Sequence, residues 1–296
     1  QLHGSLLNIR RVVSRICGAL FRGSLGISGG KDSAALAVYM RLHHPELDLQ
    51  YFFTDTGKEL PEVYEFLGSL EGFLGKPILR LNPQRDFDFW LREYGHFLPS
   101  VNTRWCTRQL KLVPFRNWIK PWLEAGDFVH SYVAIRADES HREGYDSGHQ
   151  NLTVHLPFRE AGVDHAGVMD LLQGAGVGLP KYYNWRSRSG CTFCFFQQKI
   201  EWVRLKQQHP DRFEEAKRYE KSAMEHGSPF TWSDRESLEE LEQPERVSAI
   251  EREHQARLAR AQAKIRRNPL RPQTEAESNA MEDIFAGGQG CLVCHK

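Results

Sequence analysis

The stretch Ser24-Leu25-Gly26-Ile27-Ser28-Gly29-Gly30-Lys31-Asp32-Ser33 decides the fold of this chain. Its first four residues are typical of a short strand, and helical spacing returns over residues 33–43. The glycines between them let backbone N–H groups approach phosphate oxygens, and the N-terminus of the helix adds a favourable partial charge. The sequence therefore predicts a phosphate-binding turn made by Ser28, Gly29, Gly30, Lys31, Asp32 and Ser33.

The side chains of this turn suit an anion in different ways. Lys31 supplies a point charge, Ser28 and Ser33 supply hydroxyl donors, and Asp32 would bind Mg²⁺ or brace the turn. A glycine turn capped by serine is the structural alternative, but the Lys-Asp-Ser that follows favours a functional loop. The spacing does not meet G-x-x-x-x-G-K-[ST], so this is a different kind of phosphate loop.

Strand-like runs at 49–53, 76–81 and 128–135 alternate with helical spacing, such as that of 61–74. This alternation predicts an α/β fold with a parallel sheet and helices on both of its faces. Ligands bind beyond the carboxyl ends of strands in such sheets, so the residues that follow the strands should meet at one site. Besides the glycine loop, these residues are Asp55, Thr56, Gly57, Arg136, Glu139 and Arg142.

The pattern changes beyond residue 190, and we expect two unequal parts. Residues 1–205 form the α/β domain, which opens with a helix over 5–21. Residues 206–296 form a charged, helical extension that ends in Cys291-Leu-Val-Cys294. The helical spacing of 196–208 and 210–225 leads into this extension.

The formal net charge of +1 gives no overall attraction to nucleic acid, so an anionic partner would bind local patches. Segments 104–122 and 246–271 are both basic, and the first is interleaved with tryptophans. Their structural alternatives are an amphipathic helix with core tryptophans and a solvated helix. No run of about 18 apolar residues occurs, so we expect no membrane span and a cytoplasmic protein.

Four of the six cysteines form two Cys-x-x-Cys pairs, Cys191 with Cys194 and Cys291 with Cys294. In a reducing compartment such pairs indicate metal or redox chemistry. Buried cysteines without a ligand are the structural alternative. The terminal pair could instead accept or deliver sulfur as a dithiol.

The glycine loop resembles the PP-loop of ATP pyrophosphatases, which cleave ATP to AMP and pyrophosphate. Asp55-Thr56-Gly57 resembles the second motif of the phosphoadenosine phosphosulfate (PAPS) reductase branch, and Arg136 to Arg142 is similar to its Glu-Ser-x-Arg turn. The resemblance implies ATP and Mg²⁺ as ligands of these three segments. It implies catalytic roles for Lys31, Asp32, Ser33 and Arg136.

Trp105-Cys106-Thr107 together with the distant Cys191-x-x-Cys194 resembles the adenylylsulfate reductases, in which four cysteines bind a [4Fe-4S] cluster. Here Trp105 stands where the family has its first cysteine, so Cys106, Cys191 and Cys194 carry over. The fourth ligand would be Cys294 or Cys291, or the open iron would hold a sulfur species. Zinc on the same cysteines is the alternative metal.

Residues 20–225 most resemble the ATP pyrophosphatase of bacterial DNA phosphorothioation systems of the Dnd/Ssp type. That resemblance implies adenylation of a DNA phosphate oxygen and sulfur transfer from a cysteine desulfurase, with DNA and other modification-system proteins as partners. A PAPS or adenylylsulfate reductase of sulfate assimilation and a tRNA sulfurtransferase are alternative functions. A nonenzymatic nucleotide-binding module is a further one.

Overall fold

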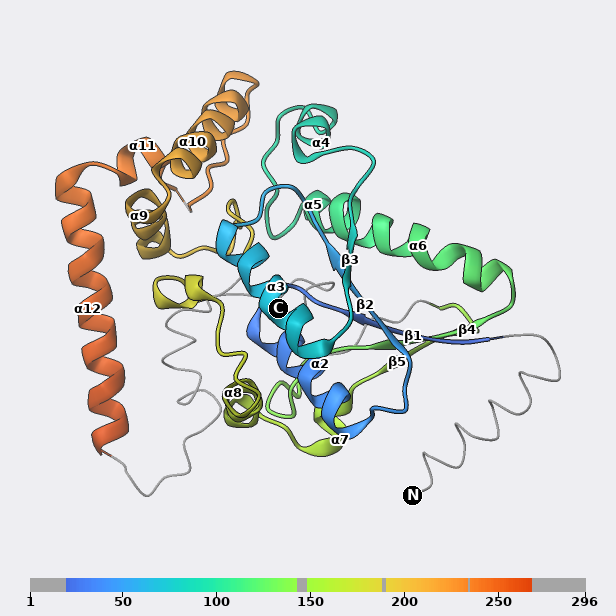
Figure 1. Ribbon diagram of the computed structural model, residues 1–296. Coiled ribbons are helices and arrows are strands. Elements are labelled where there is room, and N and C mark those ends of the chain that lie inside the picture. The colour runs from blue at the N-terminus through green and yellow to red at the C-terminus, as the bar shows by residue number, and fades with distance from the viewer. Residues whose placement is uncertain (1–19, 143–147, 188–189, 234, 268–296) are drawn as a thin grey trace.

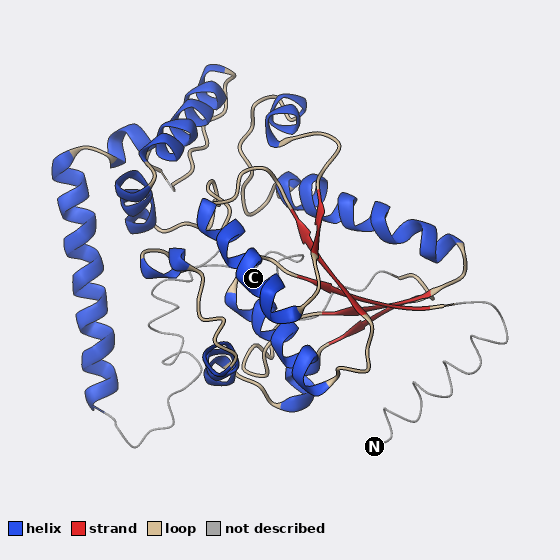
Figure 2. Cartoon of the chain, in the orientation of Figure 1, coloured by secondary structure: helices blue, strands red, loops and turns tan. Residues whose placement is uncertain are grey.

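A computed structural model describes residues 20–142, 148–187, 190–233 and 235–267 (Figure 1). Its five strands form one sheet in the order β3-β2-β1-β4-β5, and every neighbouring pair is parallel (Figure 2). The parallel α/β fold expected from the sequence is confirmed. The strands are β1 (Phe21–Gly26), β2 (Leu49–Thr54), β3 (Ile78–Leu81), β4 (Phe128–Tyr132) and β5 (Leu152–His155).

Strand β2 shows how the sheet is covered on both faces. Tyr51 and Phe53 join one hydrophobic cluster, and Phe52 between them joins another, because successive side chains of a strand point to opposite faces. On the face of Phe52 lie Phe115 and Ile119 of a single helix. The covering helices are α2 (Lys31–His43), α3 (Pro61–Leu74) and α8 (His165–Gly174) on one face, and α6 (Val113–Glu124) on the other.

The remaining elements connect the sheet or follow it. The C-terminal helices pack on one another and share the cluster of β1, since Trp232 and Ile250 are buried with Leu25. The predicted boundary between residues 205 and 206 falls within one of these helices. The elements are α4 (Phe87–Glu93), α5 (Trp105–Thr107), the π-helix η1 (Arg108–Leu112), α7 (Pro157–Ala161), the 3-10 helix η2 (Lys181–Asn184), α9 (Lys199–Gln208), α10 (Pro210–Glu225), α11 (Leu238–Leu241) and α12 (Pro244–Arg267).

Several predicted boundaries differ from the structure. Most of the helix expected over 5–21 lies outside the described residues, and its last residue, Phe21, begins β1 instead. Strand β3 starts at Ile78, directly after Pro77, which has no N–H to donate to a sheet. Strand β5 was not predicted from the sequence. Its four residues form a short edge strand with no buried apolar run to announce it.

The tryptophans of segment 104–122 are largely structural. Trp118 and Trp122 are half-buried and pack on the cluster of Phe52, and the Arg22 guanidinium lies 5.4 Å from the Trp122 ring centroid. The exposed basic residues of α6 lie on its other side. Within the part of the chain that the structure describes, no helix is long and apolar enough to cross a membrane.

Candidate nucleotide and cysteine site

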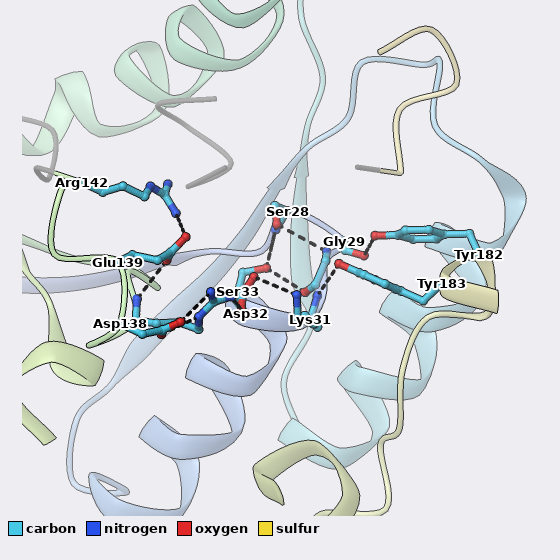
Figure 3. A network of polar contacts seen from close by, with 12 residues as sticks. Ser28, Gly29, Lys31, Asp32, Ser33, Asp138, Glu139, Arg142, Tyr182 and Tyr183 are labelled. Atoms are coloured by element: carbon cyan, nitrogen blue, oxygen red, sulfur yellow. Dashed lines mark hydrogen bonds and ion pairs between the residues drawn. The ribbon is translucent and has the colours of Figure 1, made fainter. Parts of the chain in front are cut away.

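The phosphate loop closes on itself between β1 and α2 (Figure 3). Ser28 N donates to Ser33 Oγ at 2.9 Å, the two hydroxyl oxygens lie 2.9 Å apart, and Ser33 Oγ donates to Gly30 O at 3.2 Å. Gly29 has a φ of +76°, and a Cβ added there would lie 2.6 Å from Val63 Cγ1. Only glycine therefore fits at this position.

Asp32 and Arg136 join the loop to the end of β4. Arg136 Nη1 lies 3.2 Å from Asp32 Oδ1, and both side chains are almost fully buried. The Arg136 fork also donates to Asp138 from Nε at 2.8 Å and from Nη2 at 2.9 Å. Burial opposes the charged guanidinium, but the bond to Asp138 and the charge of Asp32 outweigh it and raise the pKa of Arg136. Arg136 is thus a fixed cation beside the loop.

Glu139 and Arg142 continue this polar network. Arg136 N donates to Glu139 Oε2 at 3.2 Å, and Arg142 Nη1 donates to Glu139 Oε1 at 2.7 Å. Figure 3 shows these side chains in a row that leads away from the loop. Arg142 is therefore held by Glu139, near the loop but not within it.

Two tyrosines of η2 hold the phosphate loop from the opposite side (Figure 3). Tyr182 Oη donates to Gly29 O at 3.0 Å, and Lys31 N donates to Tyr183 Oη at 3.3 Å. The Lys31 ammonium lies 5.6 Å from the Tyr183 ring centroid and 3.9 Å from Asp32 Oδ2. The Tyr183 hydroxyl thus accepts a hydrogen bond from a backbone N–H of the loop. In such loops, backbone N–H groups of this kind bind phosphate.

The segment after β2 turns sharply at Gly57, which has a φ of +72°. Gly57 N donates to Asp55 Oδ1 at 2.9 Å, so Asp55 braces its own turn. Thr56 Oγ1 donates to buried Glu59 Oε1 at 2.9 Å. Thr56 and Glu59 face the phosphate loop across a pocket, whereas Asp55 also binds the Tyr64 hydroxyl outside it.

The Cys-x-x-Cys segment is pinned to the residues that follow β2. Leu60 N donates to Gly190 O at 2.7 Å, and Thr192 N donates to Lys58 O at 2.8 Å, so that Glu59 and Cys191 pair as an antiparallel bridge. A Cβ at Gly190 would lie 2.1 Å from Val63 Cγ2. These backbone contacts bring Cys191 to the phosphate loop, far away in the sequence.

One pocket joins the phosphate loop to the cysteines. It encloses about 80 Å³, which is too little for a whole nucleotide but enough for a small group. Four phenylalanines and Pro99 form most of its apolar wall. Its polar lining comes from Ser28, Gly30, Asp32, Thr56, Glu59, Thr107, Lys111, Tyr183, Cys106, Cys191 and Cys194.

Burial dominates the electrostatics of the cysteine end. It raises the pKa of Cys191 well above its usual value, with further contributions from the charges of Glu59 and Cys194. It also raises the pKa of Glu59, which Lys111 and the bond from Thr56 partly offset. Lys111 thus supplies positive charge at this end of the pocket.

The three cysteines share a pocket but do not converge on one point. Among the described residues, no group of three or more His, Cys, Asp or Glu side chains could hold a single metal ion. Trp105 is buried in the core and donates from Nε1 to Phe97 O at 3.0 Å, so it is a packing residue. Cys291 and Cys294, the predicted candidates for a fourth ligand, lie outside the described residues.

Tyr182, Tyr183 and Arg186 also support the site and were not predicted from the sequence. The Arg186 side chain is buried, and its Nη2 donates to Cys191 O at 2.7 Å, so it supports the cysteine segment. None of the three belongs to a motif, and their roles depend on contacts with distant residues. No local pattern in the sequence marks them as site residues.

Residues 24–146 match the family model of the phosphoadenosine phosphosulfate reductase domain. An uncharacterized protein of Methanocaldococcus jannaschii is 29% identical over 197 residues, which are 64% of this chain and 39% of that protein. An uncharacterized nin region protein, ORF290, of Escherichia phage lambda is 28% identical over 145 residues, 40% of this chain and 49% of its own. The chain therefore spans less than half the length of these relatives.

Among solved structures, phosphoadenylyl-sulfate (PAPS) reductase from Candida auris in its phosphate complex superposes with a TM-score of 0.43 at 15% identity. The superposition covers 55% of this chain and 77% of that one. The sequence match spans the phosphate loop, Cys106 and Arg136. The chain also has a parallel sheet and a Ser-Gly-Gly-Lys-Asp-Ser loop after β1. Together with these features, the match supports the superfamily of the PAPS reductase domain for this chain.

Proposed function

We propose that this protein is an ATP pyrophosphatase that activates an acceptor oxygen for replacement by sulfur. The observation that carries the proposal is the pocket lined at one end by the phosphate loop and at the other by Cys106, Cys191 and Cys194. A nucleotide bound by the loop would lie next to the three thiols. The superfamily match supports nucleotide-dependent sulfur chemistry.

In this proposal the acceptor oxygen attacks the α-phosphorus of ATP, and the bond to pyrophosphate breaks. The loop amides and Lys31 bind the departing pyrophosphate, and the buried Arg136 stabilises charge on the reacting phosphates. Mg²⁺ with Asp32 would neutralise the phosphate oxygens. Sulfur at the oxidation level of sulfide then attacks the adenylated centre and expels AMP.

The cysteines would hold a [4Fe-4S] cluster. Three thiols that line one cavity would bind three of the irons of such a cluster, and zinc on the same thiols is the alternative metal. The cluster would supply an iron on which sulfur can be held. Lys111 and Arg186 lie close enough to supply positive charge beside the thiolates.

We further propose that the acceptor is a nonbridging phosphate oxygen of DNA, with a cysteine desulfurase and other modification-system proteins as partners. Arg85, which is exposed in the loop after β3 at the carboxyl end of the sheet, supports a polyanionic acceptor. A PAPS or adenylylsulfate reductase is the second candidate, favoured by the description of the matching domain. The products separate the two, because a reductase forms sulfite and no pyrophosphate.

The sulfur end of the proposal is tested by anaerobic purification with iron, sulfide and zinc analysis. We expect iron and acid-labile sulfide in the parent, and their loss in Cys106→Ser and Cys191→Ser. Cys17→Ser is the matched control and should retain both. Zinc with no sulfide, or iron that survives both substitutions, would contradict a cluster at these cysteines. Cys294→Ser decides whether the fourth ligand comes from the terminal pair.

A further inference from the structure

A second, larger groove lies at the carboxyl end of β3. It is beside the pocket that joins the phosphate loop to the cysteines, which we call the reaction pocket. The groove is bounded by the loop between β3 and α4 and by the start of α6, which lie at the same end of the sheet in Figure 1. Its volume is about 540 Å³, within the range of roughly 300–1,000 Å³ typical of ligand sites. Its polar and aromatic lining includes Arg80, Asn82, Arg85, Trp90, Gln109 and Asn117.

None of the described residues that line this groove is acidic. The Arg85 side chain is exposed, and its guanidinium lies 4.3 Å from the Phe89 ring centroid and 6.0 Å from that of Trp90. Arg80 is partly engaged, since it donates to Ile78 O at 3.1 Å and lies 3.6 Å from Glu71. Arg85 is thus the more available cation, and it already stacks on aromatic rings.

The positive charge continues along α6. Arg116 neighbours Asn117 of the groove, and Lys120 follows one helical turn later on the same exposed face. Lys120 lies 3.6 Å from Glu124, but both side chains are about two-thirds exposed, so this ion pair is weak. An anionic chain could therefore run from the groove onto α6.

The groove and the reaction pocket share one wall. The wall is the π-helix η1, in which Gln109 lines the groove while Leu110 and Lys111 line the pocket. A π-turn carries one residue more than an α-turn, and such turns are frequent at functional sites. A chain lying in the groove would be separated from the phosphate loop only by this segment.

We propose that this groove binds a single strand of nucleic acid and guides its backbone toward the reaction pocket. Phosphates contact Arg85 and Arg116, and a base packs on the ring of Trp90. This proposal rests on the proposed function, which explains why a strand is needed in the groove. It names single-stranded nucleic acid as the class of substrate.

The lining favours a nucleic-acid strand over a simple polyanion. Its four side-chain amides each offer a donor and an acceptor, which suit base edges, whereas sulfate groups can use only the donors. They come from Asn82, Gln84, Gln109 and Asn117. Because a duplex hides its base faces, Trp90 could stack only on an unpaired base.

The test is fluorescence anisotropy with a labelled single-stranded oligodeoxynucleotide, the matching duplex, and heparin as a competing polyanion. We expect the full chain to prefer the single strand, and Arg85→Gln to weaken binding and reduce the dependence on salt by about one phosphate contact. Asn117→Asp puts an acid in the groove at an exposed position and should weaken binding further. Arg41→Gln, an exposed arginine at the opposite end of α2, is the matched control.

The proposal is overturned if the chain does not bind the single strand, if Arg41→Gln weakens binding as much as Arg85→Gln, or if heparin competes equally and Trp90→Leu has no effect. Pyrophosphate release from ATP by the wild-type chain is measured in parallel. Strand binding that depends on Arg85, without pyrophosphate release, would contradict the proposed function and support the binding groove. Pyrophosphate release, with strand binding that the groove variants do not change, would support the proposed function and contradict the binding groove.

Discussion

Arg136 Nη1 lies 3.2 Å from Asp32 Oδ1, which ties the phosphate loop to the end of β4 across 104 residues of sequence. Both side chains are buried, so each charge depends on the other, and Asp138 also pairs with Arg136. Removing one member of a buried ion pair costs roughly 3–5 kcal/mol, because the remaining charge is left unpaired. This contact therefore stabilises the fold as well as the site.

We expect Arg136→Gln to lower the free energy of unfolding by about 3–5 kcal/mol. The Arg136→Gln/Asp32→Asn double variant should recover part of that loss, since it removes charge from both sides. Chemical denaturation of the single and double variants measures the coupling. Additive effects would show that the two charges do not depend on each other.

Lys31→Met should abolish most pyrophosphate release with little change in folding. The methionine fills the buried volume of the side chain but offers no charge to a phosphate. Loss of one such stabilising group typically lowers the rate about 10²–10³-fold. Steady-state pyrophosphate release, together with a melting curve, checks both parts. An unchanged rate of pyrophosphate release in Lys31→Met would show that Lys31 is not a catalytic residue.

Tyr183→Phe should bind nucleotide more tightly than the parent. The Tyr183 hydroxyl accepts the Lys31 N–H, so a phosphate must displace it, and one such bond corresponds to roughly a two- to tenfold change in affinity. Tyr182→Phe is the matched comparison and should weaken binding, because its hydroxyl holds Gly29 O. Isothermal titration with AMP and with a nonhydrolysable ATP analogue gives both constants. Equal effects of the two substitutions would contradict the assignment.

Glu220 holds together the C-terminal helices. Its two carboxylate oxygens accept Trp232 N at 2.9 Å and Leu238 N at 2.6 Å, and burial raises the pKa of the carboxyl. Glu220→Ala leaves both N–H groups without this acceptor and should cost about 2–5 kcal/mol of stability. Glu214→Ala, an exposed neighbour on α10, should cost little. Denaturant titration compares them.

The contact between His96, which follows α4, and His226, which follows α10, should weaken in mild acid. The His96 and His226 rings stack with centroids 3.8 Å apart, and burial together with the charges of His226 and Arg92 lowers the pKa of His96 below its usual 6.5. The folded state thus disfavours the charged form. The stability this gives is complete above pH 6.5 and is lost as the pH falls below that value.

Melting temperatures at pH 7.5 and 5.5 test this dependence. The parent should lose more stability over that interval than His226→Asn, in which one cause of the lowered pKa is removed. Ser222, whose Oγ lies 2.8 Å from His96 Nδ1, is unchanged in both proteins. The same loss in both would show that His96 does not couple to His226.

The sequence predicted the sheet and the phosphate loop because their signals are local. The apolar run before Ser28 and the helical spacing after Ser33 are enough to place the turn. Strand β5 and the buried Trp232 gave weaker signals, because a short edge strand and an isolated aromatic residue show no periodic pattern of apolar residues in the sequence. The packing of the C-terminal helices on the common core therefore had to come from the structure.

The motifs of the candidate site were predictable from the sequence, but the contacts that bring the Cys-x-x-Cys segment to the phosphate loop were not. Cys191 was flagged by its spacing from Cys194, but its pairing with Glu59 depends on backbone bonds between segments more than 100 residues apart. Tyr183 was not flagged, because a tyrosine outside any motif carries no signal until a partner is seen. Contacts between distant segments are what a single sequence shows least.

The most direct test of the account is the product pattern from ATP. The purified protein is incubated with Mg²⁺, ATP labelled on the α- and γ-phosphates, and a single-stranded oligodeoxynucleotide, beside the Lys31→Met variant. We expect AMP or an adenylated strand together with an equal amount of pyrophosphate from the parent, and neither product from the variant. ADP with inorganic phosphate, or products that Lys31→Met forms equally well, would contradict the proposed function.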